Sequence, residues 1–78
     1  MNKLSDETLK KKYEDLHNNF IKGDFKKVIK GCNKVLEKRK NQLFFNLLCI
    51  AYQKIGKIEK SIDVMKEALT LNPNHPDF

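Results

Sequence analysis

Apolar residues recur along the chain at helical spacing in four separate runs. The first run consists of Leu9, Tyr13, Leu16 and Phe20. Steps of four, three and four residues place them on one side of a helix whose other sides are charged. Ser5 precedes this run, and its side-chain oxygen can accept a hydrogen bond from a backbone amide of the first turn. The pattern predicts an amphipathic helix that starts near Ser5.

Two glycines mark turns between these runs. Glycine tolerates the left-handed backbone that ends helices, so Gly23 and Gly56 are predicted turns, and Asp24 can cap the helix that follows the first. The second run consists of Phe25, Val28, Ile29, Cys32, Val35 and Leu36. The third extends over about 43–55, and the fourth ends before Pro73. The fourth run consists of Ile58, Ile62, Met65, Ala68, Leu69 and Leu71. The prediction is an all-α fold of four helices in two pairs.

The two pairs repeat one another. A shift of thirty-three residues carries Gly23 onto Gly56 and the second run onto the fourth. This shift matches Phe25 with Ile58, Ile29 with Ile62, Cys32 with Met65, Val35 with Ala68, and Leu36 with Leu69. A shift of thirty-two matches Tyr13 with Phe45, Leu16 with Leu48, and Phe20 with Tyr52. The first unit therefore lacks one residue before its glycine. So many coincident positions argue against the alternative, an ordinary four-helix bundle.

The second unit resembles the tetratricopeptide repeat, a helix-turn-helix unit with the pattern W-x2-L-G-x2-Y, A-x3-F and P. The matching positions are Phe45, Leu48, Cys49, Tyr52, Ser61, Met65, Ala68 and Pro73, of which Phe45, Cys49, Ser61 and Met65 differ in identity. The resemblance implies two stacked hairpins whose four antiparallel helices form a short right-handed superhelical solenoid. A degenerate repeat 1 would span residues 5–40 and repeat 2 residues 41–74, while 75–78 would lead toward a further repeat or form a free tail.

Two repeats are fewer than such arrays usually need, because each hairpin buries its apolar face against the next. Phe78 lies near the point where a further helix would open. We therefore expect either a fragment of a longer repeat protein or a chain that caps itself by association.

Positive charge is concentrated in the first half of the chain. The net charge is +6, and residues 1–40 hold twelve Lys or Arg against six Asp or Glu. A basic ridge along the second helix consists of Lys26, Lys30, Lys34 and Lys38. Such a ridge could contact anions, nucleic acid or an anionic membrane. No aromatic residue lies between these lysines to stack on bases, so nucleic acid is the least favoured partner and a solvated face the preferred interpretation.

The cysteines and the chain start bear on localisation. Cys32 and Cys49 lie on apolar helix faces, where we expect them to be buried as small apolar residues. The first sixteen residues lack the apolar run of a secretory signal, and no stretch is long enough to cross a bilayer. We expect a soluble, cytoplasmic protein that does not insert into membranes.

No catalytic constellation is apparent. His17 and His75 are isolated, without neighbours at metal-ligand spacing. The glycines stand singly, so no phosphate-binding loop is predicted, and Ser5 is better explained as a helix cap than as a nucleophile. We expect no enzymatic activity, no metal and no cofactor.

The third helix is apolar on nearly all sides, so we expect neighbours to enclose it. In the tetratricopeptide family the first helix of each unit lines a concave surface that receives peptides. The resemblance assigns this surface to Asn18, Leu43, Asn46, Leu47, Ile50, Gln53 and Lys54. These residues would form a groove with an apolar floor and a polar rim. Alternatively, Leu43, Leu47 and Ile50 would pack on a missing neighbour or on a second copy of the chain.

The function expected from this surface is that of a non-catalytic interaction or scaffold module, which binds a peptide or a partner helix of another protein. One alternative is a homodimeric module that associates through its exposed apolar faces. Another is an accessory domain of a larger enzyme such as a transferase. Nucleic-acid binding through the basic ridge is the least favoured.

Overall fold

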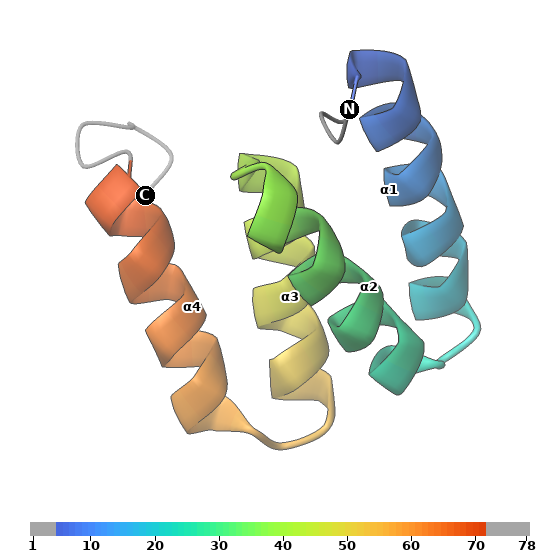
Figure 1. Ribbon diagram of the computed structural model, residues 1–78. Helices are drawn as coiled ribbons and strands as arrows, with labels where there is room; N and C mark the ends of the chain where they lie inside the picture. Colours follow the sequence, from blue (N-terminus) through green and yellow to red (C-terminus); the bar gives the residue numbers. More distant parts are fainter. Residues whose placement is uncertain (1–4, 72–78) are drawn as a thin grey trace.

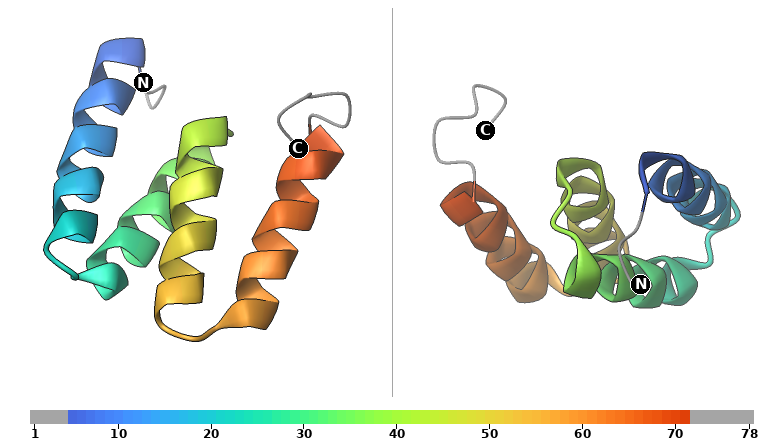
Figure 2. Two further views of the ribbon diagram at one scale, coloured as in Figure 1. Left: turned by 180° about the vertical axis from the view of Figure 1, so that it is seen from behind. Right: turned by 45° about the horizontal axis from the view of Figure 1, so that its top comes forward.

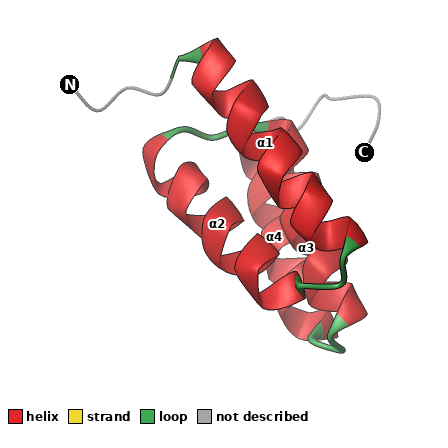
Figure 3. Ribbon diagram, turned by 90° about the vertical axis from the view of Figure 1, so that its right-hand side faces the viewer, coloured by secondary structure: helices red, strands yellow, loops and turns green. Residues whose placement is uncertain are grey.

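The computed structural model describes residues 5–71, and all the secondary structure in that range is helical (Figures 1 and 3). The helices are α1 (Asp6–Ile21), α2 (Phe25–Lys38), α3 (Gln42–Lys54) and α4 (Ile58–Leu71). The all-α fold predicted from the apolar periodicity is confirmed. The expectations for Pro73, His75 and Phe78 lie outside the described residues. No helix in the described range is both long enough and apolar enough to cross a bilayer.

Three of these helices directly follow a residue whose side chain accepts a backbone hydrogen bond. The bonds run from the Thr8 amide to Ser5 (3.1 Å), from the Lys27 amide to Asp24 (3.4 Å) and from the Leu43 amide to Asn41 (2.8 Å). Each bond satisfies an amide that the helix itself leaves without a partner. The predicted caps at Ser5 and Asp24 are confirmed, and Asn41 is a further one.

The turns at Gly23 and Gly56 have the same geometry. Their φ angles are 84° and 82°, a range in which any residue with a side chain is strained. Two amide-to-carbonyl hydrogen bonds of 2.9–3.0 Å close each turn, from Gly23 to Phe20 and Asp24 to Asn19, and from Gly56 to Gln53 and Lys57 to Tyr52. The two hairpins therefore bend alike at positions thirty-three residues apart.

The helix bodies follow a different offset from the turns. Leu16 and Leu48 are both buried, and Phe20 and Tyr52 are both half-buried, which corresponds to a shift of thirty-two residues. The missing residue thus falls between Phe20 and the turn glycine. Phe20 meets Phe25 edge-on across the Gly23 turn, with ring centroids 5.2 Å apart.

α3 is the central helix of the structure. It packs against α1, α2 and α4, whereas α4 packs against α3 alone among the four helices. From behind, α3 lies in front of α2, with α1 and α4 on either side (Figure 2, left). The expected enclosure of the apolar third helix holds in part: three of its sides meet a neighbouring helix, and one side is uncovered.

The core lies around α3. Among the described residues, the largest fully buried side chains are Phe44, Leu48, Val28, Cys32 and Ser61. Tyr13 of α1 meets Phe44 of α3 edge-on, with ring centroids 5.6 Å apart, and so ties the first helix to the central one.

Candidate functional site

One side of α3 is left uncovered by the other helices. The exposed residues of α3 are Leu43, Asn46, Ile50, Gln53 and Lys54, called here the α3 face. Steps of three and four residues bring the first four into one line along the helix. Leu43 is 54% exposed and Ile50 43%, so two branched apolar side chains face solvent on this line. The view from behind shows α3 open toward the viewer (Figure 2, left).

Leu47 was expected on the same surface, but it is only 5% exposed and belongs to the core cluster. Successive residues of an α-helix are rotated by about 100° about the helix axis. Leu47 therefore lies between the line of exposed residues and the buried side that carries Phe44. It contributes to core packing rather than to the α3 face.

Asn18 lies on α1, next to α3, and is exposed. It lines a shallow hollow of about 320 Å³ together with Tyr13, Glu14 and His17, all from α1. The ring of His17 stacks on Tyr13 at a centroid distance of 6.0 Å. Because Tyr13 also contacts α3 through Phe44, this hollow lies beside the central helix. It does not extend onto the α3 face.

The amide side chains of the α3 face retain hydrogen-bonding capacity. Gln42 donates a 3.0 Å hydrogen bond from Nε2 to Oδ1 of Asn46, which occupies only the oxygen of Asn46. Gln53 donates from Nε2 to Cys49 Sγ at 3.7 Å, a weak bond that a stronger acceptor can replace. The Nδ2 group of Asn46 can therefore donate to a partner's carbonyl oxygen. Lys54 adds one positive charge at the end of the line.

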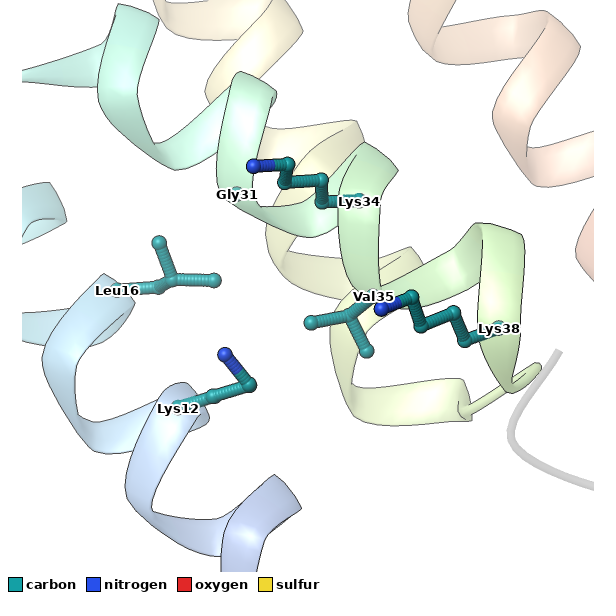
Figure 4. A pocket seen from close by; sticks show the side chains of 6 residues that line it. All are labelled: Lys12, Leu16, Gly31, Lys34, Val35 and Lys38. Carbon is teal, nitrogen blue, oxygen red and sulfur yellow. The ribbon is translucent and has the colours of Figure 1, made fainter. Parts of the chain in front are cut away.

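The four lysines of the basic ridge face two different neighbours. A step of four residues advances about 40° beyond a full turn, so Lys26 and Lys38 differ by about 120° around α2. Lys34 and Lys38 extend from α2 toward α1 (Figure 4). With Lys12 they surround a hollow of about 290 Å³ whose other lining residues are Leu16, Gly31 and Val35.

Lys26 and Lys30 line a different hollow of about 380 Å³. The other lining residues are Ile29, Tyr52, Ile55, Lys57 and Lys60. Both hollows thus join ammonium groups to apolar side chains and contain no carboxylate. The lysines are exposed, so salt screens their attraction for anions, and neither hollow holds a fully buried polar side chain that would select one ligand.

The two thiols are buried and free, as predicted. Burial raises the pKa of the Cys32 thiol from 9.0 to about 12. Burial also raises the pKa of Cys49, although hydrogen bonds with Ser61 and Gln53 lower it in part. Both thiols are therefore protonated at neutral pH and are weak nucleophiles. Within residues 5–71 no cluster of three His, Cys, Asp or Glu residues could hold a metal ion.

A second exposed apolar surface lies on α4. It consists of Ile58 (51% exposed), Ile62 (46%), Met65 (45%) and Leu69 (36%), called here the α4 stripe. The sequence pattern placed these residues on the packing side of the fourth helix. Their exposure was missed because periodicity identifies a packing face but not the neighbour that covers it. Across the described residues, α3 is the one helix beside α4, and it covers a different side.

Comparisons with known protein families, with curated proteins and with solved structures found no match to this chain. The α3 face combines apolar and hydrogen-bonding groups, whereas the α4 stripe is purely apolar.

Proposed function

We propose that the chain is a non-catalytic protein-interaction module of the tetratricopeptide type, with four antiparallel helices in a short right-handed superhelical arrangement. Its partner would be a peptide or helix that lies on the α3 face and extends over Asn18 of α1. One observation carries this proposal. The exposed residues of the central, otherwise enclosed helix fall on one line, and two of them are large and apolar.

The spacing of these apolar residues favours a helical partner. Leu43 and Ile50 are seven residues apart, which corresponds to about 10 Å along α3. Residues i and i+7 of a partner helix have the same separation and lie on one face. Same-face residues of an extended peptide recur at about 7 and 14 Å, which fits less well. A partner helix with apolar residues at i and i+7 would thus contact both side chains.

The polar residues of the face would fix the partner's orientation. Asn46 lies between Leu43 and Ile50 in the line and can donate a hydrogen bond from Nδ2. Gln53 and Lys54 lie beyond Ile50, where an amide or carboxylate of the partner would find a donor and a positive charge. Apolar contacts would supply most of the affinity, and these polar groups the direction of binding.

A library of displayed helical peptides tests the proposal. Each peptide carries Leu or Ile at i and i+7, and clones selected on the wild type are labelled and titrated by fluorescence anisotropy. We expect Ile50→Asp to weaken binding by about tenfold or more, because a charged carboxylate would be desolvated at the contact. Asn46→Ala should weaken binding by about threefold, the loss of one hydrogen bond.

Ile62→Asp is the matched control, since Ile62 is 46% exposed and Ile50 is 43% exposed. It introduces the same charge on α4, outside the α3 face, and should leave the affinity within about twofold. Failure to select any peptide, equal losses in both variants, or unchanged binding by Ile50→Asp would each contradict the proposal.

A further inference from the structure

The α4 stripe has the spacing of a coiled-coil seam. Ile58, Ile62, Met65 and Leu69 follow one another at steps of four, three and four residues. In heptad notation Ile58 and Met65 take d positions, and Ile62 and Leu69 take a positions. All four are at least 36% exposed on a helix at the outer edge of the structure (Figure 1). This arrangement is that of a surface to which a second helix packs.

The equivalent side of α2 shows what such residues do when a neighbour is present. Thirty-three residues before the stripe lie Phe25, Ile29, Cys32 and Leu36. Cys32 is 0% exposed and Leu36 5%, and the other two are half-buried. Among the four described helices, α2 packs against both α1 and α3, whereas α4 packs against α3 alone. The repeat thus places apolar residues at positions that are covered in the first hairpin and uncovered in the second.

We propose that a second copy of the chain covers the α4 stripe, with the two α4 helices antiparallel about a twofold axis. In this packing a positions oppose d positions. Ile58 would meet Leu69 of the second copy, and Ile62 would meet Met65, so that four apolar layers form across the axis. The proposal concerns a surface distinct from the α3 face and does not depend on peptide binding there.

Charge complementarity selects a second copy and its direction. Glu59 and Lys66 occupy the e positions beside the stripe, and both are exposed. Antiparallel packing places e opposite e, so Glu59 would face Lys66 of the second copy, and this pair occurs twice. The g positions, Ser61 and Ala68, are each 2% exposed and carry no charge. In a parallel pair Glu59 and Lys66 would lie opposite these uncharged residues and would form no ion pair with the second copy.

The surface predicts weak association. Four partly exposed residues from each copy bury less than the roughly 1,200 Å² of a standard interface, so we expect a dissociation constant of about 10–100 µM. Sedimentation equilibrium over a range of protein concentrations measures it directly. A species that stays monomeric up to about 1 mM would overturn the proposal, since this lies at least tenfold above the expected constant.

Charge reversals test the antiparallel geometry. Glu59→Lys alone and Lys66→Glu alone each create two like-charged pairs, and either should raise the dissociation constant about tenfold. The double variant Glu59→Lys/Lys66→Glu restores both pairs and should return to within about threefold of the wild type. A mixture of the two single variants should form a heterodimer, because both of its cross-pairs are opposite in charge.

Control variants separate this surface from others. Lys60→Glu reverses a charge at an f position, away from the stripe, and should leave association unchanged, as should Ile50→Asp on the α3 face. Ile62→Asp should abolish association, while circular dichroism verifies that each variant remains helical. The proposal would be overturned if the Ile62→Asp variant still associated, or if neither single charge reversal changed the dissociation constant. Either result leaves the peptide titration on the α3 face unaffected, so the two proposals can fail separately.

Discussion

α2 and α4 occupy equivalent places in the two hairpins, yet their apolar residues have different surroundings. The side of α2 that contains Cys32 and Leu36 is buried, whereas the matching side of α4, with Met65 and Leu69, is exposed. Both helices follow a glycine with φ near 80°. The contrast therefore does not arise from the helices or their turns. It arises because, within residues 5–71, α2 has two neighbouring helices, α1 and α3, and α4 has one, α3.

The largest effect expected from this contrast comes from one substitution made at two equivalent positions. Leu36 is 5% exposed and Leu69 is 36% exposed. Leu36→Ala should lower the free energy of unfolding by about 3 kcal/mol, because it leaves a cavity in the core. Leu69→Ala should lower it by about 1 kcal/mol or less, because solvent fills the space. Urea unfolding followed by circular dichroism, at protein concentrations below self-association, measures both. Equal losses would show that the two sides are equally packed.

The next effect tests whether the two turns are equivalent. Gly23 and Gly56 have φ angles of 84° and 82°, and a Cβ added at either would meet no atom within 4 Å. Replacement by alanine should therefore cost only backbone strain, about 1–2 kcal/mol at each site. The same urea unfolding measurement should give losses that agree to within about 0.5 kcal/mol. A much larger loss at one site would mean that its turn is held by further contacts.

Features encoded within a few residues could be predicted from the sequence. Ser5 and Asp24 cap helices because their own oxygens reach nearby amides, and the turn glycines follow from the backbone conformation that they permit. The all-round apolar character of the third helix likewise predicted its central position. Each of these predictions needs only local chemistry or composition.

Features that depend on the neighbouring helix could not be predicted. Leu47 lies only about 40° from Leu43 on a helical projection, but it is buried in the core. Lys26 and Lys38 look like one ridge, but the 40° drift of a four-residue step turns them toward different helices. The sequence pattern of the α4 stripe is that of a buried face, and only the neighbours of α4 in the structure show that it is exposed. Periodicity gives the direction of a side chain within its own helix and not the helix that it meets.

A smaller effect should appear as the pH rises above 9. The Cys32 thiol has a pKa of 9.0 in the ordinary state and about 12 when buried, so between these values the unfolded chain releases a proton that the folded chain keeps. The contribution of the protonated Cys32 thiol to the free energy of unfolding is therefore complete below pH 9. It falls by about 1 kcal/mol per pH unit as the pH rises toward 12. In the second hairpin, Met65 occupies the matching position and does not titrate.

Cys32→Ala provides the control for this pH dependence. All other titratable groups are the same in both proteins, so their contributions cancel in the comparison. The variant should be less stable at neutral pH because it leaves a cavity. Between pH 9 and pH 10.5 the free energy of unfolding should fall less steeply in the variant than in the wild type, and the two slopes should differ by about 1 kcal/mol per pH unit. Parallel pH profiles would show that the thiol ionises equally well in the folded protein.

The smallest effect concerns an ion pair between Lys40, in the connection that precedes α3, and Glu67 on α4. Lys40 Nζ lies 3.4 Å from Glu67 Oε2, and the two side chains are 50% and 54% exposed. Solvent screens a pair of this kind, so a double-mutant cycle with Lys40→Met and Glu67→Gln should give a coupling of about 0.5 kcal/mol. The coupling should disappear in about 1 M salt. In the first hairpin, Arg39 Nη2 lies 2.9 Å from Asp6 Oδ1 and ties the end of α2 to the start of α1. A coupling above about 1.5 kcal/mol for Lys40 and Glu67 would mean that this ion pair, as well as the apolar contact with α3, holds α4 in place.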